Sequence, residues 1–504
     1  DALEMVVATL EAMANGGMRD HVGGGFHRYS VDRMWRVPHF EKMLYDQAQI
    51  TLALLEAGQA AGREELLEVA ADTLRYVQRD LADEKGGFYS AEDADSLPPE
   101  ASPPQPEQVQ ARGARDEVSP KPGEVRAPAK AEGAFYTWSD REIGLLLGAD
   151  AEIFRMRFGV RPDGNAPSDP QGEFAGLNVL HVAQSVEEIG RATGRPPEDV
   201  AESIDRSRRA LFEARSRRPR PHLDDKVLAA WNGLMIAAFA RAARVLPGND
   251  AAFAHSCLRS AQGAARFVLD TMWRPDGTLL RRYRDGDASI EGYAEDYAFL
   301  VFGLLELFQS DGDLSWLDCA LELQRRQDAL FADENAGGWF STAGTDGSVL
   351  LRLKEEYDGA ERSASSVAAF NLLTLFHLSG RSEFQGPLDR AFRYFGNHMT
   401  NLPSAVPMML AAFSMHAAGL GQVVIVGRPG TPDTLDLERV LERRYRPFLI
   451  RIPLDPERRP APGGVLSFTD AMKMMSGRAT AYVCRDFSCQ LPTTDPAELE
   501  RQLG

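Results

Sequence analysis

Residues 226–243 read KVLAAWNGLMIAAFARAA, and residues 297–308 read YAFLVFGLLELF. Both stretches repeat apolar residues at the three- and four-residue spacing of an α-helix, and they do so on nearly every face of it. A helix that is apolar on all sides must be buried on all sides. Other periodic stretches, such as 63–81, keep one charged face. Buried helices wrapped by amphipathic helices would explain this alternation, so the sequence predicts a mainly helical fold in two layers.

Helical periodicity continues through most of the chain. Helices are expected at 2–15, 40–60, 63–81, 198–216, 226–245, 250–271, 292–310, 313–330, 362–380, 384–399 and 403–417, with a weaker one at 139–157. Twelve helices of this kind can pair as six hairpins.

The loops repeat as well. A Gly-Gly-aromatic signal follows the amphipathic helices, and glycine pairs allow the positive φ angles of tight turns. The signal occurs at Gly24-Gly25-Phe26, Gly86-Gly87-Phe88 and Gly337-Gly338-Trp339, with a weaker version at Asp276-Gly277-Thr278. A unit of helix, glycine turn, small hairpin and helix therefore recurs. This repeat predicts an (α/α)6 six-hairpin toroid over residues 1–418, in which one set of loops surrounds a central cavity.

Two segments depart from the repeat. Residues 97–131 are rich in Pro, Glu and Ala and lack aromatic residues, so we expect a disordered surface insertion. Residues 419–504 alternate strand-like runs, such as Gln422–Val426, with short helical patterns, which predicts a small α/β region. The Gly427–Gly430 turn after that first strand lacks the spacing of a phosphate-binding loop, so nucleotide binding is rejected.

Composition excludes several classes of function. The net charge of −18, from 56 basic and 74 acidic residues, argues against binding to nucleic acid or to an anionic membrane surface. No apolar run is long enough to span a membrane. Four cysteines do not make a disulfide framework, so a cytoplasmic location is expected and Cys484 and Cys489 are read as two unrelated thiols. No zinc-binding spacing is present, and no metal or cofactor is expected. The chain opens inside a helical pattern, which suggests further sequence upstream.

The densest group of chemically versatile residues is Gly23–Asp46, with His, Arg, Trp, Tyr and carboxylate side chains in one stretch. Within it, His39, Glu41 and Lys42 are expected at the start of a helix, just after Pro38. Helix N-termini that face a cavity bind anions and polar oxygens well. The alternative is a cluster of capping and packing residues.

Four further clusters fall between a loop and the next apolar helix. They are Glu92–Asp95, His222–Asn232, Glu291–Tyr297 and Glu355–Arg362. In the third, Asp296 stands at the start of a strongly apolar helix, where a carboxylate is costly unless it is paired or functional. Helix capping remains the alternative for each cluster. Carboxylates that accept hydroxyl hydrogen bonds, together with stacking aromatic rings, are what a sugar site needs.

The chain also resembles a known family. The stretch GGGFHRYSVDRMWRVPHFEKMLYDQAQ (23–49) is similar to a hallmark of the YyaL-like, spermatogenesis-associated protein 20 family, also called thioredoxin domain-containing proteins. Further matches are GGFYSAEDADS, DDKVLAAWNGLMIAAFARA, EGYAEDYAFLVFGLLEL and DGAERSASSVAAFNLL. The resemblance implies a six-hairpin toroid preceded by a thioredoxin-like domain, which we expect to lie outside this sequence. That toroid class includes N-acylglucosamine 2-epimerase and several glycosidases.

Three functions are compatible with these patterns. The favoured one is a glycoside-hydrolase-like enzyme, because glycoside hydrolysis needs a pair of carboxyl groups. The expected acid and base residues are Asp95, Asp225, Asp296 and Glu41. The expected substrate-binding residues are His27, Arg28, Trp35, Arg36, Trp231, Asn232, Tyr293 and Asp358. The second function is a sugar epimerase or isomerase that uses His39 with His27 or a carboxylate. The third is a non-enzymatic scaffold that binds a ligand or protein beside a thioredoxin-like domain.

Overall fold

The computed structural model describes residues 1–99, 130–166, 172–246, 250–345, 347, 349–461 and 463–504. The chain divides into two compact units. Unit 1 comprises residues 1–7, 44–90 and 225–504, and unit 2 comprises residues 8–43 and 91–224. Helix α1 (Ala2–Asn15) opens the chain. The predicted insertion at 97–131 falls for the most part outside the described residues.

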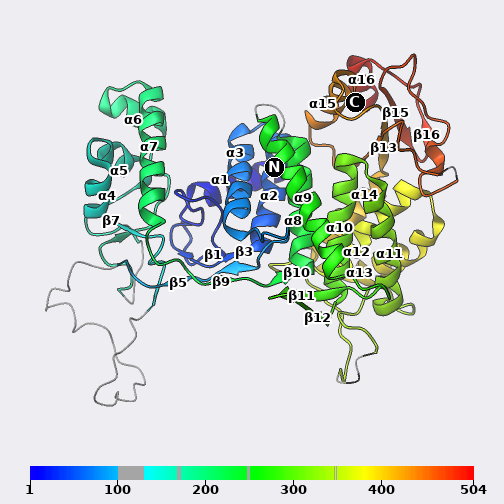
Figure 1. Ribbon diagram of the computed structural model, residues 1–504, viewed down its shortest axis with the longest axis horizontal. Helices are drawn as coiled ribbons and strands as arrows, with labels where there is room; N and C mark the ends of the chain where they lie inside the picture. The colour runs from blue at the N-terminus through cyan, green and yellow to red at the C-terminus, as the bar shows by residue number, and fades with distance from the viewer. Residues whose placement is uncertain (100–129, 167–171, 247–249, 346, 348, 462) are drawn as a thin grey trace. The chain divides into compact units, whose positions relative to one another are not determined.

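Unit 1 contains two layers of helices (Figure 1). The inner layer is formed by α2 (Leu44–Ala61), α8 (Ala229–Val245), α10 (Ala294–Asp311), α12 (Ala364–Ser379) and α14 (Pro407–Ala418). The outer layer is formed by α3 (Glu64–Tyr76), α9 (Ala251–Thr271), α11 (Leu314–Phe331) and α13 (Gln385–Asn401). Successive inner helices pack side by side in chain order, and each outer helix packs on the inner helix that precedes it in the chain.

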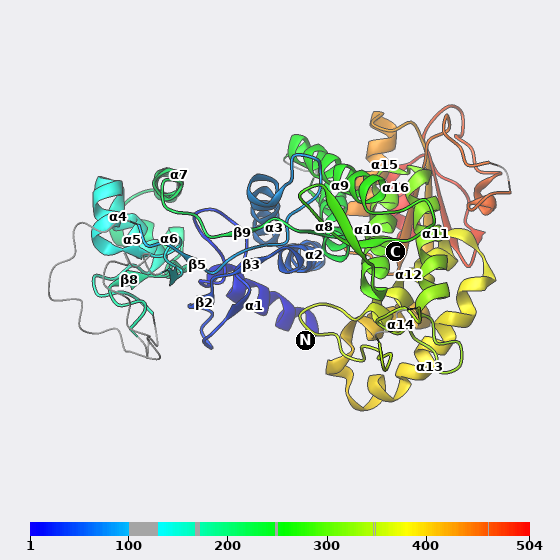
Figure 2. The same cartoon turned by 60° about the horizontal axis from the view of Figure 1, so that its bottom comes forward.

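Glycine allows the closest approach within the inner layer. Helices α8 and α10 lie beside one another in both views of the ribbon (Figures 1 and 2). A Cβ on Gly233 of α8 would lie 2.6 Å from the amide nitrogen of Leu300 of α10, and a Cβ on Gly303 would lie 3.1 Å from the carbonyl carbon of Gly233. Real Cβ atoms do not approach backbone atoms so closely, so the two helices touch backbone to backbone at this crossing.

The repeated glycine loops are closed in the same way. In each loop, the backbone N–H of one residue donates a hydrogen bond to the carbonyl of the residue four or five positions later in the sequence. The two residues that flank this hydrogen-bonded pair form an isolated antiparallel β-bridge. The donor and acceptor pairs are Asp20 with Gly25, Asp83 with Gly87, Arg274 with Thr278 and Asp333 with Gly338. The bridges join Arg19 with Phe26, Ala82 with Phe88, Trp273 with Leu279 and Ala332 with Trp339. The positive-φ glycines of these turns (Gly24, Gly25, Gly86, Gly277, Gly337 and Gly338) have φ values of +76° to +116°. The predicted internal repeat is thus present at the level of individual hydrogen bonds.

The end of unit 1 contains a four-stranded sheet in the order β14-β13-β15-β16. Its strands are β13 (Gly421–Val426), β14 (Leu449–Leu454), β15 (Thr480–Arg485) and β16 (Ser488–Cys489), and its helices are α15 (Pro432–Glu442) and α16 (Pro496–Leu503). Strand β13 is buried along its whole length. It pairs in parallel with β14 and antiparallel with β15. The predicted fold class, a mainly helical hairpin fold with a small C-terminal α/β region, is confirmed.

The interpretation of Cys484 and Cys489 as unrelated thiols was wrong. The two residues face one another in the register of β15 and β16, and a disulfide joins them. Two positions between them, Asp486 and Phe487, have positive φ and make the tight turn that brings the cysteines together. The sequence separation of five residues concealed this hairpin.

The described residues of unit 2 form three helices of eight residues each, one longer helix and several two-residue strands. The helices are α4 (Asp140–Leu147), α5 (Ala151–Phe158), α6 (Val186–Thr193) and α7 (Pro197–Arg215). The strands are β1 (Tyr29–Ser30), β2 (Pro38–His39), β3 (Lys42–Met43), β4 (Ala91–Glu92), β5 (Asp95–Ser96), β6 (Ala131–Glu132), β7 (Trp138–Ser139), β8 (Leu177–Asn178) and β9 (Leu223–Asp224). A core of buried apolar residues, including Trp138, Phe154 and Leu211, joins the helices.

Two sequence predictions about helices fail in this region. The helix expected at 139–157 is broken into α4 and α5, because Gly148 adopts a φ of +52° that ends the first helix. The placement of His39, Glu41 and Lys42 at a helix start was also wrong. Pro38–His39 pairs with Tyr29–Ser30, Lys42–Met43 pairs with Ala91–Glu92, and α2 begins only at Leu44. In the described part of the chain, no helix is both long and apolar enough to cross a membrane.

Candidate functional site

The predicted site residues fall into both units. Unit 1 holds Asp225, Trp231, Asn232, Tyr293, Asp296 and Asp358, and unit 2 holds His27, Arg28, Trp35, Arg36, His39, Glu41 and Asp95. Each group is therefore described within its own unit.

In unit 1, charged and aromatic side chains gather at the N-terminal ends of α8, α10 and α12. We call this set the rim cluster; it consists of Trp231, Arg281, Tyr293, Glu295, Asp296, Glu355 and Glu361. Strand β11 (Leu280–Arg284) pairs with β10 (Val227–Leu228), which leads directly into α8, and with β12 (Asp287–Glu291), which precedes α10. This three-stranded sheet lies at the start of α8 and α10 and supplies Arg281 to the cluster (Figure 1).

Trp231 and Glu361 form the first contact of the rim cluster. The indole N–H of Trp231 donates a hydrogen bond of 2.7 Å to the Glu361 carboxyl group, although the two residues are 130 positions apart in the sequence. The Trp231 ring also packs edge-on against Tyr45 of α2, with ring centroids 4.9 Å apart. Both Trp231 and Glu361 keep part of their surface exposed. The carboxyl group is therefore oriented by the protein and still accessible to a ligand.

Arg281 organises the second part of the cluster. Its guanidinium donates to Glu295 over 2.5 Å and to Asp296 over 2.9 Å. It also lies 4.7 Å from the centre of the Tyr293 ring, a cation–π distance. Asp296 is fully buried and accepts two further hydrogen bonds, from the backbone N–H groups of Ala230 and Tyr293. Asp296 thus joins the starts of α8 and α10 and fixes Arg281 between them.

Glu361 and Asp296 of the rim cluster have raised pKa values. Burial and the neighbouring Glu295 raise the pKa of Glu361 to about 7, against the opposing effect of the Trp231 hydrogen bond. Burial raises the pKa of Asp296 to about 6, against the opposing effect of Arg281. A carboxyl group that titrates near neutral pH in a partly exposed cluster has the property required of a general acid.

The sequence interpretation selected only part of this cluster. Trp231, Tyr293 and Asp296 were among the predicted residues, whereas Arg281, Glu295, Glu355 and Glu361 were not. Glu295 and Glu361 lie within two of the stretches that the sequence singled out, Glu291–Tyr297 and Glu355–Arg362. The sequence does not tell which carboxylate in such a stretch faces the site, because that depends on partners in other elements, Trp231 for Glu361 and Arg281 for Glu295.

Three other predicted residues of unit 1 make their hydrogen bonds or ion pairs outside the rim cluster. The amide of Asn232 is buried and exchanges hydrogen bonds with the backbone N–H and C=O of Phe88. The Asp358 carboxylate accepts from the backbone N–H of Ser363, before α12, and of Met408, in α14. Asp225 forms an ion pair of 2.7 Å with Arg284 of β11. These contacts hold loops and helix ends in place, and none of the three residues belongs to the rim cluster.

In unit 2, His39, Glu41 and Arg28 lie together. The Nδ1 atom of His39 is 2.7 Å from a carboxylate oxygen of Glu132, and its Nε2 atom is 3.6 Å from Glu41. Glu41 in turn accepts a 2.9 Å hydrogen bond from Arg28. The ring of Tyr29 stacks on His39, with centroids 5.1 Å apart. Glu132 was not predicted, because it lies 93 residues after His39 in the sequence.

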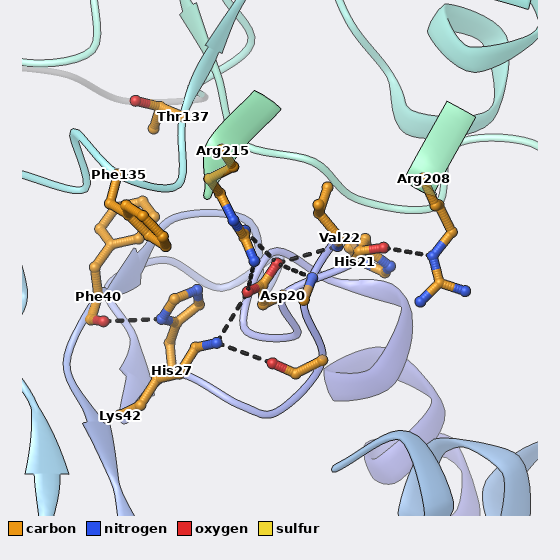
Figure 3. Close-up of polar contacts among 12 residues, drawn as sticks. Asp20, His21, Val22, His27, Phe40, Lys42, Phe135, Thr137, Arg208 and Arg215 are labelled. Atoms are coloured by element: carbon orange, nitrogen blue, oxygen red, sulfur yellow. Dashed lines mark hydrogen bonds and ion pairs between the residues drawn. The ribbon is translucent and has the colours of Figure 1, made fainter. Parts of the chain in front are cut away.

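His27 lies in a different environment, next to a buried charge cluster of Asp20, Lys42 and Arg215 (Figure 3). Its Nδ1–H donates to the Phe40 carbonyl, and its ring lies edge-on to Tyr136 at 4.6 Å. Burial, with Lys42 nearby, lowers the pKa of His27 to about 3. The ring is therefore neutral at physiological pH and closely packed.

The charged groups of this cluster bind one another and the neighbouring backbone. Arg215 donates two hydrogen bonds of 2.8 Å to the two carboxylate oxygens of Asp20, and Lys42 donates to Asp20 and to the Gly24 carbonyl over 2.9 Å each. Asp20 also accepts from the backbone N–H groups of Val22 and Gly23. Every partner of Asp20 shown in Figure 3 is a donor, so its carboxylate is fully occupied by the protein. The arrangement is that of a structural ion cluster, to which the hallmark stretch contributes Lys42.

The remaining predicted residues of unit 2 do not enter either group. Trp35 has a φ of +60° in a turn whose backbone N–H groups, including that of Arg36, bond to the Asp32 carboxylate. Asp95 lies in β5, opposite Glu132 of β6. Among the described residues of both units, no group of three or more His, Cys, Asp and Glu side chains is arranged to hold a metal ion.

Comparison with known proteins identifies relatives over the whole chain. The chain is 40% identical to human spermatogenesis-associated protein 20 across 524 aligned positions, which cover 100% of this chain and 63% of the human protein. The corresponding rat protein is 38% identical over 100% of the chain and 62% of its own length, and an uncharacterized Caenorhabditis elegans protein is 31% identical over 99% and 66%. The chain thus spans less than two thirds of these relatives. No protein-family model matches it.

Two solved structures that align with much of the chain are those of sugar-processing enzymes. A cellobiose 2-epimerase from Bacillus thermoamylovorans aligns with a TM-score of 0.40 and 9% identity, covering 83% of this chain and 72% of the epimerase. A D-mannose isomerase aligns with a TM-score of 0.36 and 12% identity, covering 79% of this chain and 86% of the isomerase.

Proposed function

Because the chain belongs to the spermatogenesis-associated protein 20 family, whose name identifies no reaction, we propose a function from the chemistry of the rim cluster. The proposal is a carbohydrate-active enzyme of hydrolase type, with Glu361 as the proton donor. The observation that supports it is the partly exposed Glu361 carboxyl group, oriented by Trp231 and with a pKa raised to about 7.

In the proposed reaction, Glu361 donates its proton to the glycosidic oxygen as the bond to the anomeric carbon breaks. Glu295 is the second carboxyl group, positioned by its ion pair with Arg281. It assists the attack of water at the anomeric carbon or attacks that carbon itself, and water ends as the hydroxyl of the new reducing end. Trp231 and Tyr293 offer aromatic faces to the sugar ring. Asp296 does not touch substrate in this scheme; it positions Arg281.

Sugar epimerisation through His39 is the less favoured alternative. His39 is partly exposed and oriented by Glu132, as an acid or base needs to be. The partner named from the sequence, His27, is buried against Phe40 and Tyr136 with its pKa lowered to about 3, so it is a poor second base. A carboxylate would have to replace it.

Substitution of Glu361 by glutamine tests the proposed role. The amide keeps the size of the side chain but cannot donate an acidic proton. We expect the hydrolysis rate on a responsive glycoside, found by screening aryl glycosides and oligosaccharides, to fall about 100-fold, the lower range for general acid catalysis. Glu322→Gln on the exposed face of α11 makes the same chemical change outside the cluster and should leave the rate unaltered. Equal rates for Glu361→Gln and the parent would exclude Glu361 as the acid.

The pH dependence of stability tests the proton affinity of Glu361 without any substrate. A carboxyl group with a folded-state pKa of about 7, above its unfolded value, stabilises the fold while it is protonated. The parent protein should therefore lose stability as the pH rises from about 4.5 to 7, on the order of 1 kcal/mol after solvent screening. Glu361→Gln should lack this loss, so its melting temperature relative to the parent should rise between pH 5 and pH 8. A constant difference across that range would contradict the raised pKa.

A further inference from the structure

Unit 1 contains a cavity of about 380 Å³ that the proposed reaction does not use. All five inner helices contribute to its wall, and the segment from Leu441 to Arg451 completes it. A volume of this size is within the range of small-molecule sites. Its lining combines arginines with aromatic side chains, among them Phe302, Phe370 and Phe448. This composition suits a ligand that is charged at one end and apolar at the other.

Most of the arginines on the cavity wall already have carboxylate partners. Arg241 binds Glu306 through two hydrogen bonds of 2.7 and 2.9 Å and binds Glu56 at 3.0 Å. Arg244 also binds Glu306, and Arg451 binds Glu438 and Glu442. These pairs neutralise one another, so they do not by themselves call for a ligand.

Arg362 is different. It lines the cavity at the start of α12, and among the residues that the structure describes it forms no hydrogen bond and no ion pair. Its guanidinium lies 5.9 Å from the centre of the Phe302 ring. Glu56 and Asp358 lie near enough to favour its charged form, whereas burial lowers its pKa. A guanidinium cannot lose its proton in a protein, so a sheltered one that makes no direct hydrogen bond to a carboxylate is costly.

A second hydrogen-bond donor on the cavity wall also lacks an acceptor among the described residues. Arg244 has a buried Nε–H group without a hydrogen-bond partner among the described residues, since only its terminal nitrogen reaches Glu306. On the cavity wall, six arginines (Arg241, Arg244, Arg362, Arg444, Arg446 and Arg451) face three carboxylates (Glu56, Glu306 and Glu442). Arg444 and Arg446 pair with Glu500, and Arg451 pairs with Glu438, so Arg362 is the arginine of this wall that has no ion pair among the described residues.

We propose that this cavity binds a small organic carboxylate with an aromatic or branched apolar body. The carboxylate pairs with the free fork of the Arg362 guanidinium, a geometry in which two parallel N–H groups match two carboxylate oxygens. The apolar body packs against Phe302 and Phe370, whose rings already contact one another with centroids 5.7 Å apart. A single free guanidinium matches a single negative charge better than it matches a phosphate dianion. This proposal does not depend on the hydrolase reaction.

Isothermal titration calorimetry with benzoate, phenylacetate and 4-methylvalerate tests the proposal. Benzamide is the uncharged match for benzoate, and inorganic phosphate tests a simple anion. We expect at least one carboxylate to bind the parent protein, benzamide to bind at least tenfold more weakly, and Arg362→Gln to weaken carboxylate binding at least tenfold. Arg362→Lys should retain part of the affinity. Arg444→Gln removes a positive charge from the same wall, but from a side chain that is 67% exposed, and should change binding less than twofold.

Thermal unfolding without ligand provides an independent readout. Arg362→Gln removes a sheltered charge that makes no ion pair with any described residue, so it should unfold at the same or a higher temperature than the parent. Three outcomes overturn the proposal: no carboxylate binds at millimolar concentration, the Arg362→Gln protein binds as tightly as the parent, or inorganic phosphate binds more tightly than every carboxylate.

Discussion

Replacing Gly233 by alanine is expected to lower the free energy of unfolding by about 3 kcal/mol or more, because one methyl group must separate two helices that touch backbone to backbone. A Cβ at this position would meet the carbonyl group of Phe299 and would lie 2.6 Å from the Leu300 amide nitrogen. These atoms belong to the hydrogen-bonded backbone of α10 and cannot rotate away as a side chain can. The added methyl group can be accommodated only if α8 and α10 move apart.

That separation should also reach the rim cluster. The start of α8 is tied to α10 through the hydrogen bond of 3.2 Å between the Ala230 N–H and Asp296, only three residues before Gly233. Moving α10 away would therefore loosen Asp296 and, with it, Arg281. We expect any glycoside hydrolysis by the folded fraction of Gly233→Ala to fall as well.

Gly263→Ala is the matched control. Gly263 lies inside the outer helix α9, and a Cβ there would meet nothing within 4 Å. Alanine is the better helix former, so this variant should be more stable than the parent by about 0.5–1 kcal/mol. Denaturant unfolding followed by circular dichroism compares the two. Equal stability of Gly233→Ala and Gly263→Ala would contradict the close crossing of α8 and α10.

The long helices could be predicted from the sequence because each has its own periodic pattern. The expected helix at 250–271 is observed as Ala251–Thr271, and that at 313–330 as Leu314–Phe331. Two-residue strands such as Lys42–Met43 have no such pattern, because they exist only through their hydrogen bonds to a neighbouring strand. Lys42 appeared to begin a helix, yet its burial depends on Asp20, 22 residues earlier.

The candidate site was less predictable, for the same physical reason. Residue type alone identified Trp231 and Asp296, because a tryptophan and a carboxylate at the start of an apolar helix are unusual. Selecting Glu361 required knowing that it accepts a hydrogen bond from Trp231, which lies 130 positions earlier in the sequence. Arg281 comes from a strand, in a stretch without any motif, and only the pairing of β10, β11 and β12 brings it to the helix ends.

Substituting Asp20 by asparagine is expected to destabilise unit 2 by about 3–5 kcal/mol, because it removes the carboxylate on which the hydrogen bonds of two buried cations converge. The side chains of Asp20, Lys42 and Arg215 are 4%, 1% and 5% exposed. Burial alone would raise the pKa of Asp20, but Arg215 and Lys42 together hold it well below its usual value. A carboxyl group with a lowered pKa stabilises the fold above its unfolded pKa of about 4, and that stability is lost as the pH falls through the folded value. Asp20→Asn should lack this loss of stability in acid.

Hydrogen exchange measured on peptides of unit 2 tests this prediction separately from unit 1. Peptides that include His27, Phe135 and Leu211 should exchange faster in Asp20→Asn, whereas peptides from α10 and α12 serve as internal references. The matched control is Glu202→Gln, which alters an ion pair with Arg206 whose two side chains are 76% and 51% exposed, and it should change stability by less than about 0.5 kcal/mol.

A triple variant separates the effect of unpaired charge from the effect of lost packing. Replacing Asp20 by leucine and both Lys42 and Arg215 by methionine removes the whole cluster at similar volume. Apolar replacement of a complete buried ion cluster is often neutral or stabilising, so the triple variant should recover most of the stability that Asp20→Asn loses. If the triple variant is as unstable as Asp20→Asn, the cluster acts through its hydrogen bonds to Gly24 and to the loop at Val22 and Gly23 rather than through charge balance. In that case the hydrogen bonds that fix the backbone of this loop contribute more to the stability of unit 2 than the pairing of the charges does.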